Sequence, residues 1–369
     1  MKHGYYLYTD NLKSSSLTSK ILMQIKAFNR ELSIEECALR TVKKPLLLRL
    51  TNVFPFCSYS RDYDGAIEHI LNPDFIYIRM ISPDMEYLSF LASIKSRFPD
   101  CKIIVEIPTY PYKKEWCSSL YGSCMYLKDF LYRKKYNRYI DRFVTFSSDD
   151  YINGVKTIQT MNGVDVESVT PVCIDRDYDP NCITLIAVAF LMRHHGYERV
   201  IEGIKDYYNR PRERKVYIII IGEGTEKKKY TKLVKKYKLL NYISLPGSMY
   251  GDDLEKMYRN VDAGLAGFGF YKDGVEQVGT LKTREYLAKG LPVVLGTDDK
   301  LFNEEDSRYG LVFPNDDSPI NIEEVLSFLD QLYSDRSKRE VSESIRQFAR
   351  GTVDNSVTLA PIIEYIERC

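Results

Sequence analysis

The segment that decides the fold is GTLKTREYLAKGLPVV, residues 279–294. Its pattern predicts a helix that begins after Gly279 and ends at Gly290, with an apolar stripe along one side. Because Pro292 cannot continue a helix, the chain turns there into a short buried strand, Leu291–Leu295. A helix that leads directly into an apolar strand is typical of α/β folds, in which helices cover a parallel sheet.

The same predicted helix carries two charged side chains, Lys282 and Glu285, which are three residues apart and share one face. The first N–H groups of a helix have no partner within it, and the helix dipole favours negative charge there. A cation beside free N–H groups suits a phosphate, and a nearby carboxylate suits hydroxyl groups. These features predict a ligand with a phosphate at one end and hydroxyls at the other, such as a nucleotide-sugar.

Length and composition narrow the class of protein. The 369 residues are enough for two domains of ordinary size. Lys and Arg number 52 against 51 Asp and Glu, which gives no reason to expect a nucleic-acid partner. The eight cysteines form no C-x-x-C pair, so we predict free thiols, no metal site and a reducing compartment. Since no signal peptide and no apolar run near the ~20 residues of a membrane span are apparent, we expect a cytoplasmic protein.

The N-terminal half alternates short apolar runs with helical patterns, which predicts a parallel sheet covered by helices. The predicted strands are residues 4–8, 45–50, 75–80, 102–107 and 142–146. Ligands of such sheets lie outside the carboxyl ends of the strands. We therefore predict that Glu106, Thr109 and Tyr110, at the end of the fourth strand, face a sugar acceptor. The alternative is a rigid turn with packed aromatic side chains.

The segment 126–142 is basic and rich in aromatic residues, with six Lys or Arg against two Asp. A basic helix with aromatic anchors can lie against anionic lipid headgroups, which makes peripheral contact with a membrane one interpretation. The other interpretation is a solvated helix that covers the sheet. Nucleic-acid binding is not expected, because no recognition module accompanies the charge.

The C-terminal half repeats the alternation and predicts a second sheet. Its expected strands are residues 183–190, 215–221, 242–245, 263–266 and 291–295. Arg193 and His195 stand at the start of the helix that follows the first of these strands. Cationic side chains beside free N–H groups favour a clamp for a diphosphate, although surface capping is the alternative. Zinc is not expected, because adjacent histidines rarely bind one metal and no third ligand is nearby.

Several motifs in a fixed order resemble the family-4 type of GT-B glycosyltransferases. They are Asn162–Asp165, His195-Gly196, Ile221–Gly224, Gly247 and Glu285–Pro292. The resemblance implies an α/β GT-B fold with two Rossmann-like domains whose parallel sheets face a central cleft. It implies an acceptor domain at 1–172, a donor domain at 173–348 and a helix at 349–369 that returns to the first domain. It also implies a retaining reaction that uses a nucleotide-sugar, most simply a UDP-sugar, and requires no metal or other cofactor.

The resemblance also assigns roles to single residues. Glu285 would hold the ribose hydroxyls, His195 would face the diphosphate, and Lys282 would neutralise the β-phosphate as the glycosidic bond breaks. The residues implied in nucleotide binding are Arg193, Gly222, Gly247, Thr280 and Leu281, together with Glu285.

Three departures from the family pattern are visible. Gln277 stands where the family has a glutamate that contacts the donor sugar, and Glu276 is its neighbour. Residues 11–16 replace the usual glycine-rich loop, and Glu106 lies in the strand where relatives have a histidine. These differences bear on the donor sugar and on the acceptor side.

The prediction is a hexosyltransferase of EC class 2.4 that transfers sugar to a glycan or lipid-linked acceptor in surface polysaccharide or glycoconjugate biosynthesis. The first alternative is a nucleotide-sugar epimerase of related fold, which needs paired acid and base residues. The second is a non-catalytic nucleotide-binding partner of another transferase, which Gln277 keeps open. The expected location is the cytoplasm, with the inner face of the membrane as a further option.

Overall fold

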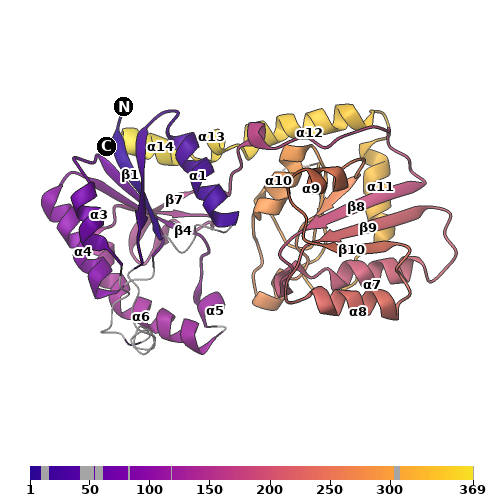
Figure 1. Ribbon diagram of the computed structural model, residues 1–369, viewed down its shortest axis with the longest axis horizontal. Coiled ribbons are helices and arrows are strands. Elements are labelled where there is room, and N and C mark those ends of the chain that lie inside the picture. The colour runs from indigo at the N-terminus through magenta and orange to yellow at the C-terminus, as the bar shows by residue number, and fades with distance from the viewer. Residues whose placement is uncertain are drawn as a thin grey trace. The chain divides into compact units, whose positions relative to one another are not determined.

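The computed structural model describes residues 1–9, 16–41, 54, 61–81, 84–117, 119–302 and 308–368. The chain forms two compact units, one of residues 1–161 with 355–369 and one of residues 162–354. Figure 1 labels the helices and strands of both. The predicted strand at 45–50 and residues 11–15 of the predicted loop lie outside the described residues.

The first unit is built on a sheet of order β2-β1-β3-β4-β5-β7-β6, in which only the pairing of β6 with β7 is antiparallel. The strands are β1 (His3–Thr9), β2 (Ser33–Leu39), β3 (Phe75–Arg79), β4 (Lys102–Ile107), β5 (Arg142–Thr145), β6 (Tyr151–Ile152) and β7 (Val155–Gln159). Successive side chains of β1 enter different cores, Tyr5 and Leu7 on one face and Tyr6 and Tyr8 on the other. The sheet is therefore buried on both faces, as parallel sheets are.

Helices cover both faces of this sheet. The core with Tyr6 and Tyr8 is closed by α1 (Ser16–Phe28) and α14 (Ala360–Glu367), which follows the short α13 (Asn355–Thr358). The core with Tyr5 and Leu7 is closed by α3 (Tyr63–His69), α4 (Met85–Arg97) and α6 (Leu120–Tyr136), and α5 (Lys113–Trp116) precedes α6. The two chain ends consequently lie in the same unit, side by side in Figure 1.

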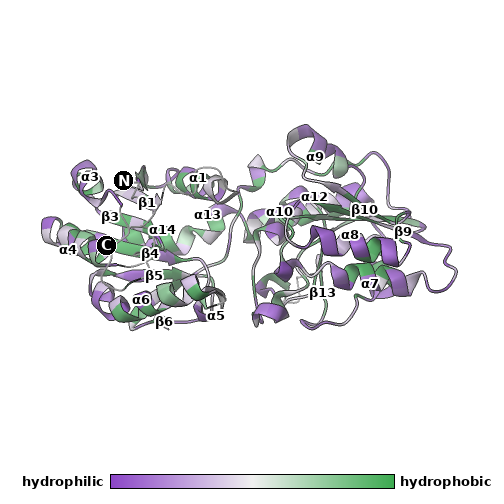
Figure 2. Ribbon diagram, turned by 60° about the horizontal axis from the view of Figure 1, so that its bottom comes forward, coloured by the Kyte–Doolittle hydropathy of each residue, from purple (hydrophilic) through white to green (hydrophobic). Residues whose placement is uncertain are grey.

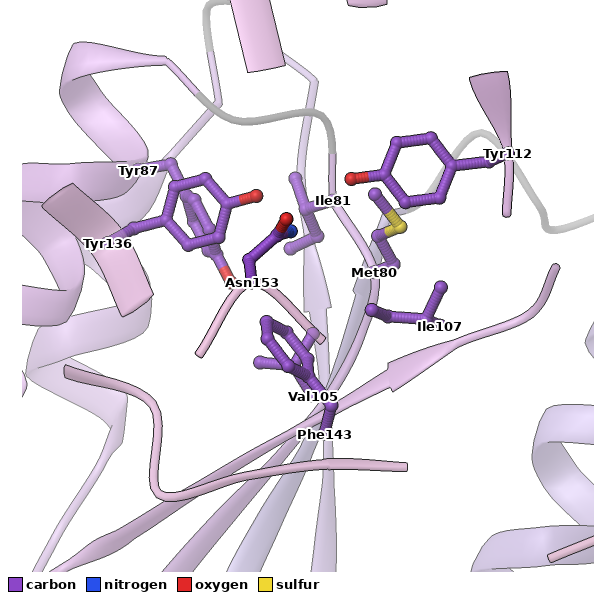
Figure 3. Close-up of a pocket in the computed structure, with 9 residues that line it drawn as sticks. All are labelled: Met80, Ile81, Tyr87, Val105, Ile107, Tyr112, Tyr136, Phe143 and Asn153. Atoms are coloured by element: carbon purple, nitrogen blue, oxygen red, sulfur yellow. The ribbon is translucent and has the colours of Figure 1, made fainter. Parts of the chain in front are cut away.

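A small cavity lies between the sheet and α4 and α6 in this unit (Figure 3). Its walls are mostly apolar, and its volume of about 10 Å³ is room for a single water molecule. The hydroxyl of Tyr87 is buried and has no hydrogen-bond partner among the described residues. A water molecule in the cavity would satisfy this hydroxyl, whereas a sugar is far too large to enter.

The second unit contains a fully parallel sheet of order β10-β9-β8-β11-β12-β13. Its strands are β8 (Cys182–Val188), β9 (Lys215–Ile221), β10 (Ile243–Gly247), β11 (Ala263–Leu265), β12 (Val293–Leu295) and β13 (Gly310–Val312). Numbered within the unit, this is the Rossmann order 3-2-1-4-5-6, whose direction reverses between β8 and β11. The second predicted sheet is confirmed.

The helices of the second unit lie on both faces of the sheet. They are α7 (Glu198–Tyr207), α8 (Lys227–Lys236), α9 (Gly251–Met257), α10 (Leu281–Lys289), α11 (Ile322–Leu332) and α12 (Lys338–Thr352). Helix α7 packs against α8 and α11, and α10 packs against α12. The helix predicted from the opening segment is confirmed as α10, which ends at Gly290 with a positive φ of 81°.

Candidate functional site

Two loops meet at the carboxyl edge of the second sheet, where the strand order reverses. One contains the short 3-10 helix η5 (Arg193–His195) after β8, and the other follows β11. The N–H of Phe268 donates to the carbonyl of His195 at 2.9 Å, and that of Gly269 donates to the carbonyl of His194 at 3.1 Å. Gly196 has a φ of +60°, and a Cβ there would lie 2.5 Å from the nitrogen of Gly269. Only glycine allows this approach, at the edge where sheets of this order bind ligands.

The N-terminus of α10 is held firmly beside this edge. The hydroxyl of Thr280 caps the helix by accepting from the N–H of Thr283 at 3.3 Å. The side-chain amide of Asn162 donates to the carbonyl of Gly279 at 2.7 Å. Arg284, on the inner side of the helix, forms a buried ion pair with Asp299. The first N–H groups of α10, including that of Leu281, therefore have a fixed direction.

Lys282 and His195, both predicted as site residues, are brought into contact. The Lys282 ammonium nitrogen lies 2.8 Å from Nε2 of His195, although the two residues are 87 positions apart. On the other side of the ring, the N–H of Met192 donates to Nδ1 of His195 at 2.9 Å. Since His195 is only 4% exposed, its ring is fixed in this position.

The protonation of this pair follows from its hydrogen bonds. Nδ1 of His195 accepts a hydrogen bond, so the proton of the neutral ring is assigned to Nε2, which points at Lys282. A charged Lys282 has only protons to offer, so the contact favours its neutral amine. Burial, opposed by Glu285, lowers the pKa of Lys282, in agreement with this assignment. Burial, Lys282 and His194 lower the pKa of His195 to about 2.

Glu285 lies one turn further along α10. Its side chain is exposed, and among the described residues it makes no hydrogen bond or ion pair. Burial of the surrounding region raises the pKa of the Glu285 carboxyl group, while Lys282 and Lys289 oppose the shift. Because the side chain is exposed, water reaches the carboxylate and stabilises its charged form. Glu285 is thus a free acceptor on the same side of the helix as Lys282.

Gln277 is tied to a carboxylate that the sequence analysis did not select. Its side-chain amide donates to Oδ2 of Asp298 at 2.8 Å, and the N–H of Val278 donates to the carbonyl of Asp298 at 2.9 Å. Glu276 is exposed beside them. Asp298 lies three positions after the end of the predicted strand 291–295. This position was an available signal, because polar residues at the carboxyl end of a parallel strand face the ligand edge.

The two glycines predicted as site residues, Gly222 and Gly247, link the ends of neighbouring strands at the same edge of the sheet. The N–H of Gly222, after β9, donates to the carbonyl of Gly247, at the end of β10, at 2.8 Å. A Cβ on Gly222 would lie 1.7 Å from the carbonyl oxygen of Ala189, so a side chain cannot be accommodated. Arg193 is exposed at the start of η5. These three residues lie at the same edge as Lys282, but each on its own strand end.

Arg199 is a positioning residue that the sequence analysis missed. It is 1% exposed, and its guanidinium group donates to the carbonyls of Phe268 and Pro314, both at 2.9 Å, and of Ser318 at 2.6 Å. It thereby fixes the loop after β11 to the segment that follows β13. A single arginine at the start of an amphipathic helix gave no sign of these partners.

The predicted acceptor-side residues lie in the first unit. Glu106 is fully buried, accepts from Tyr77 at 2.7 Å and from Gln24 at 3.0 Å, and forms an ion pair with Arg79. Burial would raise the pKa of Glu106, but Lys20 and Arg79 hold it below its usual value. Its carboxylate lies in the interior of the unit and is hydrogen-bonded there, so the structure does not support direct contact with an acceptor.

Thr109 is exposed and Tyr110 is half-buried in the loop after β4. The ring of Tyr110 lies edge-on to that of Tyr112 at 6.0 Å. Both predicted positions therefore remain open to solvent. Within the described ranges, no group of three or more His, Cys, Asp or Glu side chains could hold a metal ion.

Comparison with known proteins identifies the class. Residues 178–347 match the family described as "Glycosyl transferases group 1". The Anabaena protein HepE in complex with UDP has a similar structure, with 13% identity, a TM-score of 0.62 and complete coverage of both chains. Sucrose-phosphate synthase from Thermosynechococcus elongatus is 10% identical, with a TM-score of 0.64 and complete coverage of both chains. The lipopolysaccharide outer core galactosyltransferase WaaB is 12% identical, with a TM-score of 0.58, covering 100% of this chain and 99% of its own.

No curated protein sequence matches this chain. The fold is that of the GT-B glycosyltransferases, as predicted. Residues 178–347 therefore resemble a group 1 glycosyltransferase domain, and the activity class that this match indicates is sugar transfer, EC class 2.4.

Proposed function

We propose that the protein is a retaining hexosyltransferase that uses a UDP-sugar, needs no metal and transfers the sugar to a glycan or lipid-linked acceptor. The observation that carries this proposal is the contact of Lys282 with His195 at the N-terminus of α10, with the free carboxylate of Glu285 one turn away. HepE, whose structure is similar, was crystallised with UDP and with UDP-glucose. Surface polysaccharide or glycoconjugate biosynthesis is the setting that we propose.

The proposed roles follow from the chemistry of the donor. The diphosphate would lie at the α10 N-terminus and accept from the first N–H groups, from Lys282 and from Nε2–H of His195. As the bond between sugar and diphosphate breaks, negative charge grows on the β-phosphate, so these donors stabilise the transition state more than the ground state. Glu285 would accept from the two ribose hydroxyls. Gln277 and Asp298 would contact the donor sugar.

Thermal unfolding with added nucleotides tests the donor class. UDP and one UDP-sugar should raise the unfolding temperature more than ADP, GDP or their sugars, without added metal. A ligand at 100 times its dissociation constant stabilises a protein by about 2.7 kcal/mol. No stabilisation by any nucleoside diphosphate would contradict the proposed site, and dependence on added Mg²⁺ would contradict the metal-free reaction.

Donor binding should take up protons at Lys282. Burial lowers the pKa of Lys282 in the free protein, and a bound diphosphate would raise it. The affinity for UDP should be highest below the pKa that Lys282 has in the free protein, and it should fall as the pH rises from there through the pKa of Lys282 in the complex. Net proton uptake is expected between these two values. Calorimetry of UDP binding in buffers of different ionisation enthalpy measures this uptake. Lys282→Met should abolish it, and uptake that persists in this variant would place the titrating group elsewhere.

The alternatives predict different products from the same assay. An epimerase would convert the donor without an acceptor, whereas a non-catalytic partner would bind donor and consume none. The hydrogen bond between Gln277 and Asp298 favours neither the epimerase nor the non-catalytic partner. Through this bond, Asp298 places a carboxylate next to position 277, where the family has a glutamate. Transfer that depends on added acceptor is the result expected here.

We further propose a cytoplasmic protein that reaches a lipid-linked acceptor at the membrane surface. The basic segment 126–142 is the part of the chain from which such peripheral contact is expected. None of the described helices is both long and apolar enough to cross a bilayer.

A further inference from the structure

A single side chain, that of Asn315, joins two segments at the ligand edge of the second sheet. Asn315 lies shortly after β13, the strand at one edge of this sheet (Figure 2). Its amide oxygen accepts from the N–H of Tyr271 at 3.0 Å, and its amide nitrogen donates to the carbonyl of Val275 at 2.8 Å. The hydroxyl of Thr297 also donates to the amide oxygen, at 3.3 Å. Asn315 thus binds the loop after β11 and the segment after β12 at the same time.

The direction of the Asn315 amide follows from its partners. A backbone N–H can only donate and a backbone carbonyl can only accept, so the oxygen must face Tyr271 and the nitrogen must face Val275. Among side chains of this size, only an amide offers a donor and an acceptor in one plane. Aspartate has the same shape, but it would place a second acceptor against the carbonyl of Val275.

The part of the loop between the two contacts is a closed turn. It consists of the 3-10 helix η6 (Phe270–Asp273) and Gly274, which has a positive φ of 66°. Within the turn, the N–H of Val275 donates to the carbonyl of Phe270 at 3.2 Å. Because both ends of the turn are hydrogen-bonded to the same amide, Asn315 sets the direction in which the chain leaves the turn at Val275.

The two segments that Asn315 binds carry the pair of Gln277 and Asp298. Val275 lies two residues before Gln277, and Thr297 directly precedes Asp298. Beyond Asn315, the segments are joined by the hydrogen bond from the Gln277 amide to Oδ2 of Asp298, at 2.8 Å. The position of Gln277 relative to Asp298 therefore depends on the contacts that Asn315 makes just upstream of both.

Asn315 itself stands on a firm support. The buried guanidinium group of Arg199 donates to the carbonyl of Pro314, the preceding residue, at 2.9 Å. The N–H of Phe313 donates to the carbonyl of Leu295 at 2.8 Å, which continues the pairing of β13 with β12. Arg199 and Leu295 both lie outside the loop after β11. The sheet and Arg199 thus fix the amide, and the loop takes its position from the amide.

We propose that Asn315 is a positioning residue for the donor sugar: it sets the distance between Gln277 and Asp298 and thereby the affinity for the sugar part of the donor. This inference rests on the proposed function, in which these two side chains contact the sugar. Asn315 itself does not touch it. Since a misplacement of about 1 Å is enough to weaken a polar contact strongly, the contacts to the sugar depend on Asn315. The contacts to the diphosphate do not, because Asn162 holds the start of α10 separately.

Amide hydrogen exchange of the full chain, without any nucleotide, tests the hold of Asn315 on the two segments. In Asn315→Ala, the N–H of Tyr271 loses its acceptor. The hydrogen bond from the N–H of Val278 to the carbonyl of Asp298, at 2.9 Å in the wild type, is no longer braced. Both amides should therefore exchange faster than in the wild type. Wild-type exchange at Val278 would overturn the positioning role, whatever the donor is.

Calorimetry with UDP, UDP-glucose, UDP-galactose and UDP-N-acetylglucosamine tests the consequence for the donor. For the UDP-sugar that the wild type prefers, Asn315→Ala and Asn315→Asp should lower the affinity about tenfold, whereas the affinity for UDP should change less than about twofold. Asn315→Asp keeps the size of the side chain, so its loss would come from the hydrogen bond to Val275 and not from packing. An equal loss for UDP and the UDP-sugar would overturn the assignment to the sugar. If the wild type bound none of the four, the proposed function and the sugar contact would both fail, and hydrogen exchange would still decide whether Asn315 holds the turn.

Asn321→Ala is the matched control. The side chain of Asn321 caps α11 by accepting from the N–H of Glu323 at 3.1 Å. Its loss should lower the unfolding temperature but leave the ratio of the affinities for UDP-sugar and UDP unchanged. Thr297→Val removes only the longest contact of Asn315, so it should shift this ratio in the same direction as Asn315→Ala, but less. A shift in Asn321→Ala as large as that in Asn315→Ala would mean general destabilisation and would overturn the proposal.

Discussion

Lys282→Ala is expected to lower kcat/KM for sugar transfer by about 10²-fold or more, the size of effect seen when one preorganised donor to a developing anion is removed. The reason is the position of Lys282 at the α10 N-terminus, 2.8 Å from His195. Because the charge on the β-phosphate grows during bond cleavage, the loss should appear mainly in kcat. Steady-state kinetics with the donor identified by thermal unfolding measures the effect.

Two variants separate charge from folding in this prediction. Lys282→Arg keeps the positive charge and should retain part of the rate, although the larger guanidinium group cannot reproduce the same contact. Lys235→Ala, on the exposed side of α8, should behave like the wild type. An unchanged kcat in Lys282→Ala, with the protein folded, would show that the diphosphate lies elsewhere.

Glu285→Ala is expected to cost on the order of 10²-fold or more in donor turnover, mainly through weaker donor binding. Hydrogen bonds to a charged group are stronger than those between neutral groups. The carboxylate of Glu285 forms no hydrogen bond with any described residue, so it can accept from a ligand. Glu285→Gln should be intermediate, since an amide oxygen still accepts. Binding of UDP and of donor by calorimetry, together with turnover, measures both variants.

A chemical change in the ligand makes this prediction specific. If Glu285 holds the ribose hydroxyls, the wild type should bind 2′,3′-dideoxy-UDP much more weakly than UDP. Glu285→Ala should bind the two nucleotides with the same, weak affinity. Glu276→Gln, at an exposed carboxylate before α10, should keep the wild-type preference for ribose. A full preference for ribose in Glu285→Ala would assign the diol contact to another residue.

The sequence predicted those parts of the fold that depend on local pattern. The helix within 279–290 and the five predicted strands of the second sheet have clear apolar patterns and glycine or proline ends, and the structure confirms them. Strand β13, at the edge of this sheet, was not predicted. Lys282 and Glu285 could be selected because a single helix sets their spacing. The contact of Lys282 with His195 depends on the meeting of two loops, and the sequence could indicate only that both lie at carboxyl ends of strands.

The features that escaped prediction are set by distant partners. Arg199 binds carbonyl groups more than 60 residues away, and backbone carbonyls leave no trace in a sequence pattern. Glu106 was expected to face a sugar acceptor, but it is buried between Arg79 and Gln24 of helix α1.

The return of α13 and α14 to the first unit affects the order in which the chain can mature on the ribosome. Leu359, Ile362, Ile363 and Ile366 complete the core that contains Tyr6 and Tyr77, yet they are translated after the entire second unit. Residues 162–354 are contiguous and can condense as they emerge, since domains generally fold as units during synthesis. The apolar face of β1 and β3 must wait for the last helix. This half-finished sheet is where nascent chains would aggregate or engage a chaperone.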